Sequence, residues 1–132
     1  MQNEFLKGKK ILIVEDDFSS RLYLNKILEK EGVILLNAGD GKEAIDIALS
    51  NPDIDIILMD IRLPDMDGYE TAEKIREFRV DIIIIAQTAF GLLGVKEKLI
   101  ESGFNDFLIK PIFHQKLIDK LIANLAGKQS IV

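Results

Sequence analysis

Five short apolar runs recur along this chain, and an amphipathic segment follows each of them. The runs are nearly continuous instead of alternating between apolar and polar residues, which is typical of strands buried on both faces. Strands of that kind occur in parallel sheets whose two faces are covered by helices. The five runs are Ile11–Val14, Val33–Leu36, Ile54–Met59, Ile82–Ala86 and Phe107–Ile109.

Apolar residues recur every three or four positions in the segments between the runs, as they do on the buried face of a helix. Ser19 or Ser20 is expected to cap the first helix, and Gly32 to end it. Five strands that alternate with five helices predict an α/β fold, a doubly wound parallel sheet with right-handed crossovers. The apolar positions of the other helices lie between Ala44 and Leu49, Tyr69 and Phe78, Val95 and Ile100, and Leu117 and Leu125.

The length of 132 residues suits one domain with its own core. Residues 9–126 are expected to form this domain, between a loose N-terminal extension at 1–8 and a C-terminal tail at 127–132. No apolar stretch approaches the roughly 18–20 residues of a membrane helix, and the N-terminus lacks the apolar region of a secretion signal. We therefore expect a cytoplasmic protein without a membrane contact.

The composition excludes several kinds of site. With no cysteine the chain has no disulfide, thiol nucleophile or thiolate zinc site, and its single histidine excludes a metal centre built from several histidines. The net charge of −5 would repel the phosphates of a nucleic acid. Direct nucleic-acid binding is therefore not expected.

Side chains with a carboxylate, hydroxyl or ammonium group follow four of the five apolar runs, at the point where each expected strand ends. In open α/β sheets, ligands bind outside these carboxyl ends of the strands. Carboxylates, a hydroxyl and an ammonium group from four strands are therefore expected to meet at one edge of the sheet. They belong to Glu15, Asp16 and Asp17 after the first run, Asp60 after the third, Gln87 and Thr88 after the fourth, and Lys110 with Pro111 after the fifth.

Carboxylates crowded at one edge repel one another, and burial raises the cost of their charge. A divalent cation removes this cost, and a set of oxygen ligands with retained waters suits Mg²⁺. With Mg²⁺ bound, the edge would attract a phosphoryl group. Asp60 can then act as the nucleophile, because carboxylates form aspartyl phosphates. Thr88 can donate a hydrogen bond to a phosphoryl oxygen, and Lys110 can neutralise another.

Each of these residues also has a structural interpretation. An Asp after a strand most often forms a turn or caps a helix. Asp17 is expected either to join the acidic pair or to cap the first helix. Asp65 and Asp67 are interpreted as turn and capping residues, and His114 as a surface residue on the first turn of the last helix. The joint placement of the remaining residues at one edge favours the functional interpretation.

Four stretches resemble the motifs of a known family in order and spacing: ILIVEDD, LMDIRLPDMDG, AQTA and LIKPI. Over about residues 9–126 the chain resembles the receiver domain of two-component response regulators, and most of all the receivers of hybrid sensor histidine kinases. The resemblance implies a flavodoxin-like (βα)5 fold, with a five-stranded parallel sheet of order 2-1-3-4-5 and helices on both faces. It implies a phosphorylation-dependent switch that catalyses its own phosphorylation and dephosphorylation, and is not otherwise an enzyme.

The resemblance also implies a phosphoryl acceptor and a metal site. Asp60 would accept a phosphoryl group from a phosphohistidine on a sensor histidine kinase or a histidine phosphotransfer domain. Mg²⁺ would be the cofactor. Its ligands would be Asp60, Asp16 directly, Glu15 mainly through water, and the backbone carbonyl of Arg62.

The switch residues follow from the same resemblance. Thr88 would move toward the phosphoryl group and Lys110 would pair with it. Phe107 would turn inward as the aromatic switch, and Pro111 would follow a cis peptide bond. The surface that changes would comprise the fourth helix, the fifth strand and the fifth helix. It begins with the apolar segment Phe90–Gly94, expected either to bind a partner or to start a helix that packs inward.

The phosphodonor is expected to dock near the first helix, where Phe18, Ser19 and Leu22 are candidate contacts, although Phe18 is equally well interpreted as a core residue. A homodimer that forms on phosphorylation is a further expectation from the family.

Two other functions are weighed against the switch. A phosphatase of the haloacid-dehalogenase type also uses an Asp nucleophile with Mg²⁺, but it needs a second Asp two residues later, where this chain has Arg62. A pseudo-receiver would bind a partner without being phosphorylated. The intact acidic residues, together with Thr88 and Lys110, argue against it.

Overall fold

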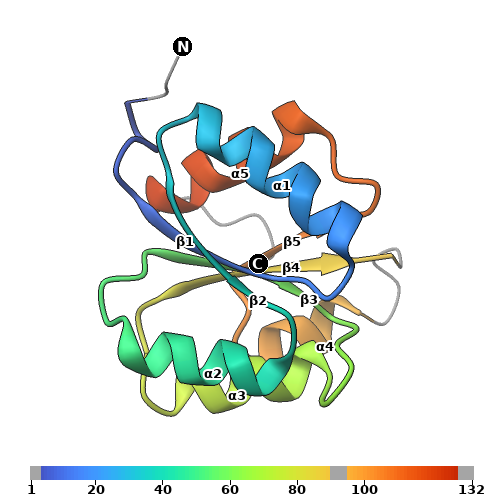
Figure 1. The fold of residues 1–132 in the computed structure, drawn as a ribbon. Helices are drawn as coiled ribbons and strands as arrows, with labels where there is room; N and C mark the ends of the chain where they lie inside the picture. Colours follow the sequence, from blue (N-terminus) through green and yellow to red (C-terminus); the bar gives the residue numbers. More distant parts are fainter. Residues whose placement is uncertain (1–3, 90–94, 128–132) are drawn as a thin grey trace.

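The computed structural model describes residues 4–89 and 95–127, so the expectation for Phe90–Gly94 lies outside the described residues. Its parallel strands lie in the order β2-β1-β3-β4-β5, which confirms the expected fold class (Figure 1). The elements are β1 (Lys10–Val14), α1 (Phe18–Lys30), β2 (Ile34–Ala38), α2 (Gly41–Ser50), β3 (Ile56–Asp60), α3 (Gly68–Arg76), β4 (Ile83–Thr88), α4 (Lys96–Glu101), β5 (Asp106–Ile109) and α5 (His114–Leu125).

Helices cover both faces of the sheet, α1 and α5 on one and α2, α3 and α4 on the other (Figure 1). Alternate residues of one strand therefore enter different apolar clusters: Leu12 faces α2 and α3, whereas Ile11 and Ile13 face α1 and α5. Both faces of the central strands are apolar for this reason, which explains the continuous runs in the sequence. None of the helices in the described ranges is long and apolar enough to cross a membrane.

The first helix is capped by Asp17, whose carboxylate accepts a hydrogen bond from the Ser20 amide at 2.9 Å. The expectation that Ser19 or Ser20 would be the cap is wrong, because both lie inside α1. An Asp at the cap position bonds an amide of the first turn, as Asp17 does here. At the other end Gly32 has a φ of +80°, which glycine adopts readily, and the helix ends there as expected.

Residues 1–8 were expected to form a loose extension, but Leu6 is part of the core. Its side chain is 0% exposed and lies in the apolar cluster on the α1 and α5 face. The Gly8 amide donates to the carbonyl of Gly32 at 2.9 Å, which joins this segment to the turn after α1. The core therefore begins before residue 9.

Leu6→Ala is expected to lower the free energy of unfolding by about 2–3 kcal/mol, because it removes buried methyl groups and leaves a cavity. Phe5→Ala is the matched control, since the Phe5 side chain is 57% exposed and its loss should cost less than about 1 kcal/mol. Urea denaturation of both variants measures the difference. Equally small losses would show that the core does not depend on residue 6.

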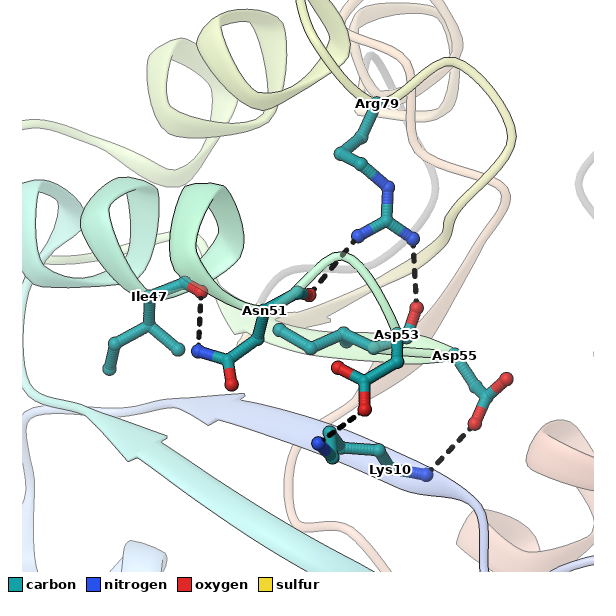
Figure 2. A network of polar contacts seen from close by, with 7 residues as sticks. Lys10, Ile47, Asn51, Asp53, Asp55 and Arg79 are labelled. Atoms are coloured by element: carbon teal, nitrogen blue, oxygen red, sulfur yellow. Dashed lines mark hydrogen bonds and ion pairs between the residues drawn. The ribbon is translucent and has the colours of Figure 1, made fainter.

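Polar contacts hold the amino edge of the sheet (Figure 2). The Arg79 guanidinium, just after α3, donates to the carbonyl of Ile54 at 2.9 Å. On β1, the Lys10 amide donates to the Asp55 carboxylate at 2.9 Å, and its ammonium group pairs with Asp53 at 2.6 Å. These bonds tie the start of β3 to α3 and β1, so this edge has a structural role.

Candidate functional site

The opposite, carboxyl edge of the sheet has a pocket of about 410 Å³. The ends of β1, β3, β4 and β5 contribute to it, as expected for parallel strands whose carboxyl ends meet. Six of the residues singled out in the sequence for metal or phosphoryl chemistry line it: Glu15, Asp16, Asp60, Arg62, Thr88 and Lys110.

Asp60 is the last residue of β3, and only 5% of it is exposed. One carboxylate oxygen, Oδ1, accepts a hydrogen bond from the Arg62 amide at 3.0 Å, and the other, Oδ2, accepts one from Lys110 Nζ at 2.6 Å. The next amide, that of Ile61, donates to the carbonyl of Gln87 on β4 at 3.1 Å. Backbone and side chain therefore both hold the Asp60 carboxylate toward the pocket.

Two further carboxylates come from the end of β1. Glu15 is 1% exposed and Asp16 is exposed, and one carboxylate oxygen from each lies within 4.8 Å of the other and of one from Asp60. Glu15 Oε2 accepts a hydrogen bond from the Asp17 amide at 3.3 Å. Its other oxygen, Oε1, is buried without a hydrogen-bond partner, and Lys110 Nζ lies 3.6 Å away.

The site places three carboxylates near the one ammonium group of Lys110. Burial, and next the neighbouring Asp60, raise the pKa of Glu15 from 4.5 to about 7, although Lys110 opposes the rise. Burial also lowers the pKa of Lys110, but Asp60 and Glu15 outweigh it and the net change is upward. Buried carboxylates with an orphaned oxygen and one ammonium group fit a divalent cation with oxygen ligands, such as Mg²⁺.

Thr88 and Lys110 are placed by adjacent strands. Thr88 is the last residue of β4 and is 3% exposed. Its carbonyl accepts a hydrogen bond from the Lys110 amide at 2.8 Å, which joins the ends of β4 and β5 at the pocket. A hydroxyl and an ammonium group therefore reach the pocket from the side opposite the acidic end of β1.

The two expected switch residues do not line this pocket. Phe107, on β5, is partly buried against the cluster on the α2, α3 and α4 face, and Lys120 Nζ lies 5.4 Å from the centre of its ring. The peptide bond between Lys110 and Pro111 is cis, as the family resemblance implied.

Three other aspartates singled out in the sequence form hydrogen bonds with backbone amides at the amino ends of helices. Asp17 caps α1, and Asp67 caps α3 by accepting a hydrogen bond from the Glu70 amide at 2.9 Å. Asp65 does more than shape a local turn, because it accepts hydrogen bonds from two amides of α2. His114 is the exposed first residue of α5, as expected.

Another buried acid, Asp106, was not singled out in the sequence. It is 0% exposed at the start of β5, and its carboxylate accepts hydrogen bonds from Lys120 Nζ and Asn124 Nδ2, both at 2.9 Å. This network ties α5 to the strand that carries Phe107. Lys120 and Asn124 lie 14 and 18 residues further along the chain, so no local pattern connects them to Asp106.

Gly68 sits close behind the acceptor. A Cβ at this position would lie 2.5 Å from the Asp60 carbonyl oxygen and 2.8 Å from the Ile61 Cα, and both are backbone atoms that cannot swing aside. Gly68→Ala is therefore expected to displace the end of β3 and to lower stability by about 1–3 kcal/mol. Gly39→Ala is the control, because a Cβ there meets nothing within 4 Å.

Urea denaturation of the two glycine variants tests this close approach. If Gly68→Ala were as stable as Gly39→Ala, α3 would not need its close approach to β3.

Known proteins resemble this chain in both sequence and fold. The family model of the response regulator receiver domain matches residues 11–122 of the chain. Two-component response regulator 24 of Arabidopsis thaliana is 34% identical over 110 residues, which are 83% of this chain and 79% of that protein. Hybrid signal transduction histidine kinase I of Dictyostelium discoideum is 38% identical over 122 residues, which are 86% of this chain and 7% of that protein.

Among solved structures, the chain is similar to the co-crystal structure of the Saccharomyces cerevisiae histidine phosphotransfer protein Ypd1 and the receiver domain of its downstream response regulator Ssk1. The TM-score is 0.82 at 30% identity, and the match covers 92% of this chain and 91% of the matched chain. The fold, the family model and the relatives agree with the resemblance seen in the sequence. The chain belongs to the response regulator receiver domains of two-component signalling.

Proposed function

We propose that this domain is a phosphorylation switch whose acceptor is Asp60. The contact of Lys110 Nζ with Asp60 Oδ2 at 2.6 Å inside an acidic pocket carries the proposal, because it pairs a buried nucleophile with a cation. A carboxylate oxygen of Asp60 would attack the phosphorus of a phosphohistidine. The phosphorus–nitrogen bond would break, and its electron pair would stay with the histidine nitrogen, which takes up a proton.

Four groups would hold Mg²⁺: the carboxylates of Asp60 and Asp16 directly, the carboxylate of Glu15 mainly through water, and the backbone carbonyl of Arg62. When bound, Mg²⁺ would neutralise negative charge shared by these acids and the phosphoryl oxygens. The exposed Asp16 and the buried Glu15 suit a site that admits the donor from solvent on one side only.

The remaining groups act on the phosphoryl oxygens. The Lys110 ammonium group would move its contact from Asp60 Oδ2 to a phosphoryl oxygen, a short displacement because both lie at the same carboxylate. The Thr88 hydroxyl would donate a hydrogen bond to a second oxygen. Movement of Thr88 would then draw Phe107 inward and change the surface of α4, β5 and α5.

A histidine phosphotransfer domain or a sensor histidine kinase would supply the phosphoryl group. The co-crystal structure of Ypd1 with the Ssk1 receiver supports this class of partner. Phe18 is 70% exposed and Leu22 is 44% exposed, so both are available on the surface of α1, and Phe18 is not a core residue. A homodimer formed on phosphorylation, and a place in the cytoplasm, belong to the same proposal.

The test is intact-mass analysis after incubation with acetyl phosphate, with Mg²⁺ or with a chelator. One added phosphoryl group that requires Mg²⁺ is expected. Release of free phosphate with no modified protein would instead favour a phosphatase. The absence of both would leave a domain that binds its partner without being phosphorylated.

A further inference from the structure

We infer that Asp65 is a positioning residue for the metal ligand at Arg62, because it ties the β3–α3 loop, residues 61–67, to the amino end of α2. The inference rests on the proposed function, since it concerns the Mg²⁺ site described there. The carbonyl of Arg62 belongs to a loop, whereas the three carboxylates stand at or beside strand ends. Its position therefore depends on what holds the loop.

Both oxygens of the Asp65 carboxylate accept hydrogen bonds from α2. Oδ1 accepts a hydrogen bond from the Gly41 amide at 2.8 Å, and Oδ2 accepts one from the Lys42 amide at 2.9 Å. Oδ1 also accepts from the Met66 amide, next to it in the loop, at 2.9 Å. One side chain thus joins two amides of a helix to an amide of the metal-binding loop.

The fit between the loop and α2 is close. A Cβ at Gly41 would lie 2.5 Å from Met66 Cγ and 2.6 Å from Thr71 Oγ1. Any larger residue at this position would force the side chains of Met66 and Thr71 to shift, whereas glycine leaves them in place. The contact is therefore built from both sides, by a glycine on the helix and an Asp on the loop.

The loop has a second fixed point at its base. The Gly68 amide donates to the Ile61 carbonyl at 2.7 Å, which closes residues 61–68 into a ring, and the Arg62 amide donates to Asp60 Oδ1 at 3.0 Å. Asp65 lies within this ring and binds two amides of α2, which gives the loop a second attachment besides its base. Anchors at both ends restrain the Arg62 carbonyl between them.

The helix does not need Asp65 as its own cap. Asp40 caps α2, because its carboxylate accepts a hydrogen bond from the Glu43 amide at 2.8 Å. The Asp65 carboxylate adds a negative charge at the positive end of the helix dipole. Burial alone would raise the pKa of Asp65, but the hydrogen bonds from the amides of Gly41, Lys42 and Met66 outweigh it. The net change is downward, so the carboxylate is held ionised.

The experiment compares Asp65→Ala with Asp40→Ala, which removes a cap from the same helix end but leaves the loop bonds in place. Calorimetric titration with Mg²⁺ is expected to show roughly tenfold weaker binding for Asp65→Ala and little change for Asp40→Ala, as for partners that orient metal ligands elsewhere. Asp65→Asn keeps one acceptor oxygen and should bind Mg²⁺ with intermediate affinity. Amide exchange in the metal-free proteins should be faster at Arg62 and Met66 in Asp65→Ala alone.

A second readout separates positioning from general damage. At saturating Mg²⁺, Asp65→Ala should be phosphorylated by acetyl phosphate at nearly the wild-type rate, because Asp60, Thr88 and Lys110 are unchanged. Equal Mg²⁺ affinities for Asp65→Ala and wild type, or equal losses in Asp65→Ala and Asp40→Ala, would overturn the inference. Failure of the wild-type protein itself to bind Mg²⁺ would overturn the proposed function, and the inference with it.

Discussion

Asp60→Asn is expected to lose phosphorylation by acetyl phosphate completely, with or without Mg²⁺. An amide cannot replace the carboxylate as the nucleophile. The fold should be retained, because an Asn side-chain oxygen can still accept the hydrogen bond that the Arg62 amide gives to Asp60 at 3.0 Å. Intact-mass analysis over a time course measures the loss, and the circular dichroism spectrum checks the fold.

Asp67→Asn is the matched control for this loss. Asp67 lies in the same loop and is exposed, and its role is to cap α3. Asn caps a helix about as well as Asp, so this variant should be phosphorylated like the wild type. A phosphoryl group on Asp60→Asn would move the acceptor to another residue. Loss in both variants would implicate the loop instead of the single carboxylate.

The second large effect concerns Glu15, whose pKa rises from 4.5 to about 7 through burial and then through Asp60. In the unfolded chain the pKa of a Glu is about 4.3. Between these two values the folded protein without metal holds a proton that the unfolded chain has lost. The contribution of Glu15 to the free energy of unfolding therefore falls as the pH rises from about 4.5 to about 7.

Glu15→Gln removes this titration and keeps the shape of the side chain. With a chelator at pH about 8, the variant is expected to be more stable than the wild type by about 1–3 kcal/mol. With Mg²⁺ the order should reverse, because the wild type gains stability from binding the cation and the variant binds it less well. Urea denaturation from acidic to alkaline pH, with and without Mg²⁺, measures both effects.

Glu73→Gln supplies the control, because Glu73 is an exposed residue of α3 away from the pocket. It should follow the wild-type pH dependence with and without the cation. If Glu15→Gln followed the wild-type curve as closely as Glu73→Gln does, the buried charge of Glu15 would not limit stability. The acidic pocket would then not destabilise the metal-free fold, and Mg²⁺ would have no such destabilisation to offset.

The order of the elements and the chemistry at the strand ends were predictable from the sequence. Continuous runs such as Ile11–Val14 report burial on both faces, and that is a local property of a few neighbouring residues. A parallel sheet brings the carboxyl ends of its strands to one edge, independently of the conformation of the loops. Asp60, Thr88 and Lys110 could therefore be assigned to one site from the sequence. The cap of α1 was not predicted in this way: Ser19 or Ser20 was expected there, whereas Asp17, left open between a cap and a member of the acidic pair, caps the helix.

The partners of individual side chains were decided by the tertiary structure. Lys110 meets Asp60 across 50 residues of chain, and Asp65 reaches α2 across 24. No periodicity or turn preference extends over such distances, because these contacts depend on how the helices pack on the sheet. The burial of Leu6 also depends on tertiary packing, because this residue lies before the first strand and only the folded structure places it in the core. Sequence alone thus determined which groups share an edge, and packing determined which of them touch.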